Sequence, residues 1–149
     1  MEELKEDVET KPYIVIKIGE EQYGIDITYI DNIIRMTRIT RVPKVADYIR
    51  GVINLRGEVI PVLSLRLKMF LPPDEITNNS RILILRTEKQ GMIGFIVDAV
   101  REVVTLDSDQ ITKTTGSYNP DDDSSHFISG VGQYNGTLIS ILDLSVITE

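Results

Sequence analysis

The stretch that decides the fold is residues 51–65, GVINLRGEVIPVLSL, because the chain contains a second version of it. Residues 130–144, GVGQYNGTLISILDL, align with it without a gap. Six aligned pairs are identical, among them Gly57 with Gly136, and most other pairs match apolar to apolar or turn residue to turn residue. Self-similarity of this kind predicts an internal duplication.

Two blocks upstream repeat in the same order. Residues 13–17 (YIVIK) match residues 82–86 (ILILR), and residues 24–27 (GIDI) match residues 94–97 (GFIV). Because β-rich sequences resemble one another, a single match would have little weight. Three matched blocks in one order indicate a true duplication.

The duplication divides the chain into a first repeat, residues 12–66, and a second repeat, residues 81–145. Residues 67–80 contain a Pro-Pro and an Asn-Asn pair and are expected to link the repeats. The second repeat is longer because of an insertion at residues 116–126. Residues 1–11, MEELKEDVETK, are acidic and are expected to form a disordered tail.

Within each repeat the pattern predicts short strands. The isoleucines of residues 14–18 alternate along the chain, as a half-buried strand requires. Gly57 and the Asn135-Gly136 pair stand at the tips of two predicted hairpins, since a tight turn needs residues that adopt a positive φ angle. Pro61 has no amide hydrogen, so its strand is expected to lie at a sheet edge or to be bulged there.

A short helix is predicted after the second strand of each repeat. Ile27, Ile30 and Ile33 follow helical spacing. Thr28 is placed to cap the first turn of this helix. In the second repeat Asp98 takes the capping position, and valines follow the same spacing.

These elements predict a mainly β protein. A unit of about five short strands and one short helix buries little apolar surface alone. A small sheet protects its edge strands best by closing into a barrel. We therefore expect two similar five-stranded barrels packed together, one for each repeat and each with a short helix. Exchange of a terminal strand between the two lobes is left open.

Charge is unevenly distributed along the chain. The net charge is −7, which argues against a general nucleic-acid binder. Residues 35–68, however, contain eight basic and two acidic side chains, a local net charge of +6. A basic region on an acidic protein suits docking to an acidic protein partner. A solvated rim paired internally with the acidic remainder is an equal alternative on charge alone.

The composition indicates a cytoplasmic protein. The chain has no cysteine, which excludes disulfides and thiolate metal sites and indicates a reducing compartment. No apolar run approaches membrane-spanning length, so no direct membrane insertion is expected. The N-terminal residues contain no apolar signal segment.

We expect no enzymatic activity, no metal and no cofactor. The one histidine, His126, stands in the polar run DDDSSHF without a nucleophile-elbow pattern. The acidic cluster at residues 121–123 lacks the spacing of a calcium loop. Two other hypotheses can be tested: a small enzyme that acts through His126, and a double barrel that binds nucleic acid. The basic region supplies only one aromatic residue, Tyr48, for the second of these.

The run YIRGVINLRGEVIPV at residues 48–62 resembles the signature of the CheW-like domain family. Residues 23–27 (YGIDI), residues 94–98 (GFIVD) and the pair Gly130-Val131 also fall where that family has them, so the resemblance covers nearly the whole chain. It implies a double SH3-like barrel. It also implies a chemotaxis adaptor that joins methyl-accepting chemoreceptors to the regulatory domain of the histidine kinase CheA, which has a similar fold. Such an adaptor would reach the membrane receptor arrays only through its partners.

The resemblance implies a receptor contact on the NLRG turn, at Asn54, Arg56 and Gly57, which extends to Asn32 on the predicted first helix. Independently of the family, Arg56 aligns with Asn135 of the other repeat, so the barrel does not require arginine at this position. An exposed arginine on a rigid hairpin can donate several directed hydrogen bonds. The alternative is that Arg56 is only a solubilising turn residue.

The resemblance also implies a kinase contact on an apolar patch of one barrel, where Ile27, Ile30 and Val42 match the family positions. Ile27 and Ile30 belong as well to the stripe that is predicted to pack the first helix against its barrel. The burial of these two side chains decides between the two roles.

Overall fold

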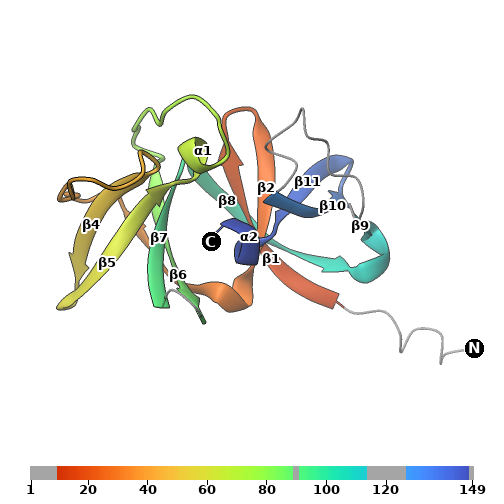
Figure 1. The fold of residues 1–149 in the computed structure, drawn as a ribbon. Coiled ribbons are helices and arrows are strands. Elements are labelled where there is room, and N and C mark those ends of the chain that lie inside the picture. The colour runs from red at the N-terminus through yellow and green to blue at the C-terminus, as the bar shows by residue number, and fades with distance from the viewer. Residues whose placement is uncertain (1–9, 89–90, 114–126, 148–149) are drawn as a thin grey trace, which may run out of the picture. The chain divides into compact units, whose positions relative to one another are not determined.

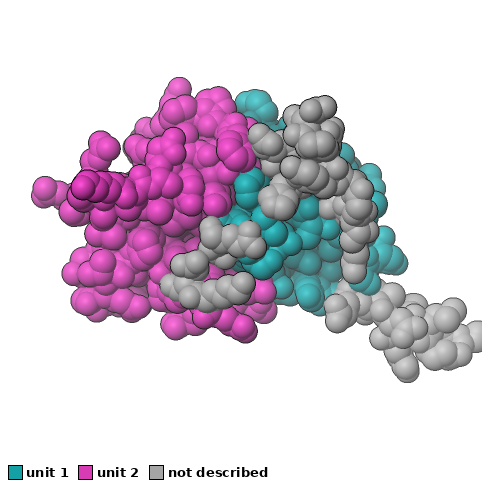
Figure 2. Space-filling model, viewed as in Figure 1, with its two compact units in different colours: residues 1–27, 101–149 teal, residues 28–100 magenta. Residues whose placement is uncertain are grey.

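A computed structural model describes residues 10–88, 91–113 and 127–147 of the chain. The chain divides into two compact units, which Figure 2 shows in different colours. Unit 1 comprises residues 1–27 and 101–149, and unit 2 comprises residues 28–100. Each unit is built around its own β-sheet, so the prediction of a mainly β protein is confirmed.

Unit 2 contains a five-stranded sheet with the order β3-β6-β7-β5-β4 (Figure 1). After β3, the backbone of Thr40 pairs with Val52 of β4 through two N–H···O bonds of 2.8 Å. The chain thereby returns from one end of the sheet to the other and closes the barrel. The elements of unit 2 are β3 (Ile30–Arg35), β4 (Ile49–Leu55), β5 (Glu58–Ser64), α1 (Leu65–Lys68), β6 (Arg81–Thr87) and β7 (Gly91–Val97).

Unit 1 contains a six-stranded sheet with the order β8-β1-β2-β11-β10-β9. Its elements are β1 (Thr10–Ile18), β2 (Glu21–Asp26), β8 (Ala99–Asp107), the 3-10 turn η3 (Ser108–Gln110), β9 (Ile111–Lys113), β10 (Ile128–Tyr134), β11 (Thr137–Leu142) and α2 (Leu144–Ile147). β8 begins two residues before the division between the units. Because β1 begins at Thr10, the strand includes two residues that were expected in the acidic tail.

Branched aliphatic side chains fill both barrels, as the alternation along the strands predicts. The buried cluster in unit 2 consists of Ile53, Ile60, Val62, Ile82, Ile84 and Ile96. The buried cluster in unit 1 consists of Tyr13, Val15, Val104, Leu106, Ile139 and Ile141. Each unit therefore has a core of its own.

The compact units do not follow the sequence repeats, so the division into one lobe for each repeat has to be corrected. The β1–β2 hairpin of the first repeat lies in unit 1, where β2 runs parallel to β11. The β6–β7 hairpin of the second repeat lies in unit 2, where β7 runs parallel to β5. Each barrel thus combines a hairpin of one repeat with the later strands of the other, which is more than the exchange of a terminal strand.

Two matched glycines lie where the hairpins meet the later strands of the other repeat. A Cβ atom on Gly24 would lie 3.1 Å from side-chain carbons of Ile139 and Ile141, which belong to β11 of unit 1. A Cβ atom on Gly94 would lie 2.9 Å from Ile82 and 3.4 Å from Val62 in unit 2. The close approach of neighbouring side chains explains why the second strand of each hairpin has glycine at this place.

The prediction of helices beginning near Thr28 and Asp98 is wrong. The 3-10 turn η2 (Ile27–Tyr29) leads directly into strand β3, and Asp98 is followed by strand β8. Side-chain burial alternates along β3, which is the strand period. Short helices do occur, but α1 and α2 follow the last strand of each repeat. Ser64 caps α1, because its hydroxyl accepts a 3.1 Å hydrogen bond from the amide of Leu67.

The prediction of an edge or bulged strand at Pro61 is also wrong. β5 lies between β7 and β4, and the irregularity in the β4–β5 ladder falls between Ile49 and Gly51. Pro61 is tolerated inside the sheet because pairing with β7 begins only at Val62. Its missing amide hydrogen therefore leaves that ladder intact.

Candidate functional site

The hairpin of β4 and β5 carries three of the predicted receptor residues, and its tip lies at the lower left of Figure 1. Arg56 and Gly57 have φ angles of 54° and 83°. Positive φ at both central residues is the geometry of a type I′ turn. Asn135 and Gly136 form the same turn in unit 1, with φ angles of 51° and 79°. The two hairpins are thus conformational equivalents that differ in one side chain of the turn.

Arg56 is a strained residue in this turn. The left-handed conformation costs an ordinary residue about 1–2 kcal/mol, whereas asparagine and glycine adopt it readily. Asn135 is therefore the residue that the turn prefers, and Arg56 is not. The Arg56 side chain is exposed, so core packing does not offset its cost. Because asparagine is also polar, solubility alone does not explain arginine here, and the contrast favours a role outside the fold.

Asn54 holds the strained turn together. Its side-chain oxygen accepts a 3.1 Å hydrogen bond from the amide of Gly57. Val59 pairs with Asn54 across the hairpin, and its side chain is 64% exposed. Leu138 occupies the matching position in unit 1 and is 63% exposed. The tip therefore displays a guanidinium group beside an exposed aliphatic side chain, a combination that suits protein docking. Val59 was not among the predicted receptor residues, although strand alternation places it on the outward face.

Asn32 lies on strand β3 and not on a helix. A register shift interrupts the β3–β6 ladder between Ile30 and Asn32, and the Asn32 side chain accepts a 2.8 Å hydrogen bond from the amide of Ile33. The pairing registers put the start of β3 and the Arg56-Gly57 turn at the same end of the five-stranded sheet. Asn32 is nevertheless on a different strand from the hairpin, at the opposite end of the strand order.

The predicted kinase residues are partly accessible. Ile27 and Ile30 are both half-buried, so neither is a core residue, and Val42 is 38% exposed. Ile30 and Val42 belong to unit 2, whereas Ile27 is the last residue of the first segment of unit 1. The side chains of Tyr29 and Ile33 are more exposed than those of Ile27 and Ile30. The predicted helical period would turn Ile33 inward, whereas the strand period turns it outward.

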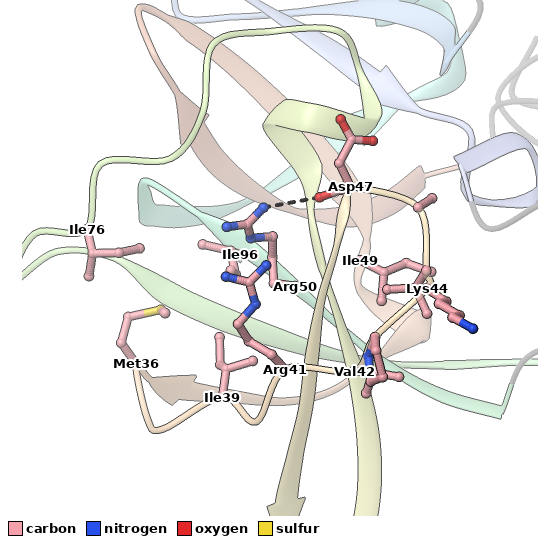
Figure 3. A pocket seen from close by; sticks show the side chains of 13 residues that line it. Met36, Ile39, Arg41, Val42, Lys44, Asp47, Ile49, Arg50, Ile76 and Ile96 are labelled. Carbon is pink, nitrogen blue, oxygen red and sulfur yellow. Dashed lines mark hydrogen bonds between the residues drawn. The ribbon is translucent and has the colours of Figure 1, made fainter.

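Unit 2 also contains an open depression of about 720 Å³ (Figure 3). Apolar and cationic side chains from the β3–β4 connection, β4 and β7 surround it, including Ile39, Ile49, Ile96, Arg41, Lys44 and Arg50. Figure 3 shows Arg41 and Arg50 extending toward its centre, whereas Lys44 points outward. Arg50 is oriented by a 3.1 Å hydrogen bond from its guanidinium to the backbone oxygen of Asp47. The depression can therefore receive an apolar group together with a negative charge.

Metal-ligand residue types do not cluster in the described part of the chain. The described residues contain no group of three or more histidine, cysteine, aspartate or glutamate residues that could hold a metal ion. His126 and the acidic cluster at residues 121–123 lie outside the described residues. Asp98, expected to cap a helix, instead accepts two hydrogen bonds from Arg66, of 3.0 and 2.5 Å. These bonds and the charge of Asp98 raise the pKa of Arg66, against the opposing effect of burial, and the pair fixes α1 to the end of β7.

The aromatic residue of the basic region is already engaged. The Lys68 ammonium lies 4.2 Å from the ring centre of the half-buried Tyr48, a cation–π contact. A stacking platform for nucleic-acid bases needs aromatic faces open to solvent. Among the described residues, no helix has the length and apolar composition needed to cross a membrane.

Comparisons with known proteins agree on one family. The model of the CheW-like domain matches residues 12–149. Chemotaxis protein CheW of Bacillus subtilis is 35% identical over 91% of this chain and 85% of its own length, and that of Thermotoga maritima is 32% identical over 100% and 95%. The crystal structure of the scaffolding protein TtCheW from Thermoanaerobacter tengcongensis matches with a TM-score of 0.84 and 31% identity, over 95% of this chain and 94% of that one. Two SH3-like barrels fit this match, and the chain belongs to the CheW-like domain family.

Proposed function

We propose that this protein is a non-enzymatic scaffold that couples methyl-accepting chemoreceptors to the histidine kinase CheA in bacterial chemotaxis. Similar chains are called chemotaxis proteins, and a solved structure with the same fold is called a scaffolding protein. The observation that carries the proposal is the contrast between Arg56 and Asn135. Equivalent turns contain the preferred residue in one barrel and a strained, exposed arginine in the other.

The receptor side of the scaffold is the β4–β5 tip. Arg56 donates directed hydrogen bonds to the receptor, Asn54 and Gly57 hold the turn that presents it, and Asn32 extends the contact along β3. Exposed Val59 supplies apolar contact beside the guanidinium. A desolvated arginine with apolar surroundings is a typical hot spot of a protein interface.

The kinase side is the apolar surface around η2 and the β3–β4 connection. Ile27, Ile30 and Val42 contact the regulatory domain of CheA, and the more exposed Tyr29 widens this surface. The scaffold works in the cytoplasm, where both partners present their signalling domains, and it uses no cofactor. Burial of a few aliphatic and aromatic side chains is sufficient for a reversible signalling contact.

Binding to two purified fragments tests the proposal. We would measure the affinity for a receptor cytoplasmic fragment and for the regulatory domain of CheA by calorimetry. Arg56→Glu is expected to weaken receptor binding by about 30-fold or more, the size of an interface hot spot, and to leave kinase binding within about twofold. Val42→Glu is expected to do the reverse. Loss of both partners in Arg56→Glu with an intact fold would contradict two separate surfaces.

The enzymatic alternative has its own test. His126→Ala is expected to leave both affinities and the coupling of receptor signals to kinase activity unchanged, because the scaffold acts only by binding. Loss of coupling in this variant, with both affinities retained, would support an enzyme that acts through His126.

A further inference from the structure

The end of helix α1 has an unusual residue. The amide of Leu71 donates a 2.8 Å hydrogen bond to the backbone oxygen of Arg66, and the amide of Phe70 donates a 3.2 Å bond to that of Leu67. These two bonds define a Schellman motif, in which the first residue past the helix cap takes the left-handed conformation. Phe70 is this residue, with a φ angle of 64°. Glycine is preferred there because any Cβ atom is strained.

Phe70 is unfavourable for folding in two ways. A bulky side chain in the left-handed region is a genuine conformational outlier. Its side chain is also 68% exposed, the largest exposed fraction among the large apolar side chains of the described residues. Neither helix capping nor core packing explains phenylalanine at this position. Strain and exposure at one aromatic residue instead favour a role in docking.

Residues 70–76, called the Phe70 segment, are complementary to the depression of unit 2 in polarity and charge. Ile76 and Glu75 in the same segment are exposed, so it offers apolar side chains beside a carboxylate. The depression offers apolar side chains beside two cations, Arg41 and Arg50. A guanidinium can lie over the face of a phenyl ring, and a carboxylate can pair with it.

We propose that Phe70 of one copy of this chain docks into the depression of a second copy. Ile76 lies in the Phe70 segment and also lines the depression, so the two complementary surfaces adjoin each other on unit 2. Two copies related by a two-fold axis can therefore each insert Phe70 into the depression of the other. This arrangement buries both phenyl rings in one closed dimer. The depression is also lined by Val42, a residue of the proposed kinase side, so a second copy and the kinase would compete for this surface. The dimer itself does not depend on the proposed chemotaxis function.

The contact is small and therefore weak. A phenylalanine side chain buries roughly 150–250 Å². Two such anchors with their aliphatic neighbours stay below the roughly 1,200 Å² of a stable interface. The dimer is expected to form with a dissociation constant on the order of 100 µM.

Sedimentation velocity over a range of protein concentrations tests the dimer. Wild type is expected to change from monomer toward dimer as the concentration rises to about 1 mM. Phe70→Gly is expected to weaken dimerisation at least tenfold and to raise the thermal unfolding midpoint, because glycine relieves the strained φ angle. Phe70→Ala is expected to weaken dimerisation equally without this full gain in stability. Val103→Ala, which shortens an exposed side chain of β8, is the control and is expected to dimerise like wild type.

The second half of the test locates the docking site. Arg41→Glu is expected to lose dimerisation as Phe70→Gly does, and a mixture of the two variants is expected to regain part of it, because one intact contact can form between them. A monomeric wild type at every concentration would overturn the proposal. So would dimerisation that survives either substitution, or a mixture that associates no better than its components.

Discussion

Replacing Arg56 with asparagine should separate the stability of the protein from its binding. Arg56 has a φ angle of 54°, and Asn135 has an angle of 51° in the equivalent turn. The left-handed conformation costs an ordinary residue about 1–2 kcal/mol, most of which asparagine avoids. Arg56→Asn is therefore expected to raise the free energy of unfolding by about 1 kcal/mol. For a chain of this length that corresponds to a rise of about 3 °C in Tm.

The same substitution should weaken the receptor contact, because asparagine cannot replace the five N–H donors of a guanidinium. We expect the receptor dissociation constant to increase by about 30-fold or more. The reciprocal variant, Asn135→Arg, is the matched control. It should lower stability by about the amount that Arg56→Asn adds, and it should leave receptor binding unchanged.

Urea denaturation and calorimetric titration of the same three proteins would provide both quantities. The reasoning about strain is refuted if Arg56→Asn is less stable than wild type. The reasoning about function is refuted if the receptor affinity of Arg56→Asn equals that of wild type. A variant that is more stable but binds the receptor more weakly cannot owe its weaker binding to unfolding, because unfolding lowers stability and binding together.

Three further predictions concern stability and can be measured by urea denaturation. Gly51→Ala should lower the free energy of unfolding by about 3 kcal/mol or more, because the added Cβ would lie 2.1 Å from the backbone oxygen of Thr40 where the barrel closes. Gly57→Ala should lower it by only about 1 kcal/mol, because no atom lies within 4 Å of the added Cβ. Asn54→Ala should cost about 1 kcal/mol through loss of the turn hydrogen bond and should weaken receptor binding less than Arg56→Glu. Arg66→Ala should lower the free energy of unfolding by about 2 kcal/mol. This loss relative to wild type should stay constant between about pH 6 and 9. The pKa of Arg66 is raised from an already high value, and its contribution to stability is lost only when the pH rises past that pKa. Equal losses in the two glycine variants, a neutral Asn54→Ala, or a pH-dependent loss at Arg66 within that range would each contradict the corresponding contact.

The duplication made the barrels predictable, but the exchange of hairpins between them was not. Gly24 and Gly94 occupy equivalent places in two similar repeats. A hairpin can therefore pair with the later strands of its own repeat or of the other repeat and bury nearly the same side chains. Sequence patterns report which residues are buried, and they do not distinguish two pairings of equal burial.

The secondary structure of residues 27–35 shows a different ambiguity. Isoleucines at positions 27, 30, 33 and 34 fit a helical stripe, but positions 30, 32 and 34 also share one face of a strand. The run is rich in β-branched residues, which favour strands, and this preference outweighs the helical spacing. The incorrect helical prediction turned Ile33 inward and placed Asn32 on a helix.

The candidate site was only partly visible in the sequence. Comparison of the repeats singles out Arg56, because Asn135 marks what the fold itself prefers. The outward position of Val59 and the left-handed conformation of Phe70 depend on how the strands pair and how α1 ends. Such features require three-dimensional structure, since no residue pattern marks phenylalanine for a position that normally takes glycine.

The central claim is that one chain bridges two partners, and it is tested most directly by recruitment of the kinase. Receptor cytoplasmic fragments would be immobilised on beads, and retention of the CheA regulatory domain would be measured with and without this protein. We predict that wild type retains the kinase domain on the beads, and that Arg56→Glu does not, although it still binds that domain in solution. Equal retention with Arg56→Glu and with wild type, or retention without any added scaffold, would contradict the account.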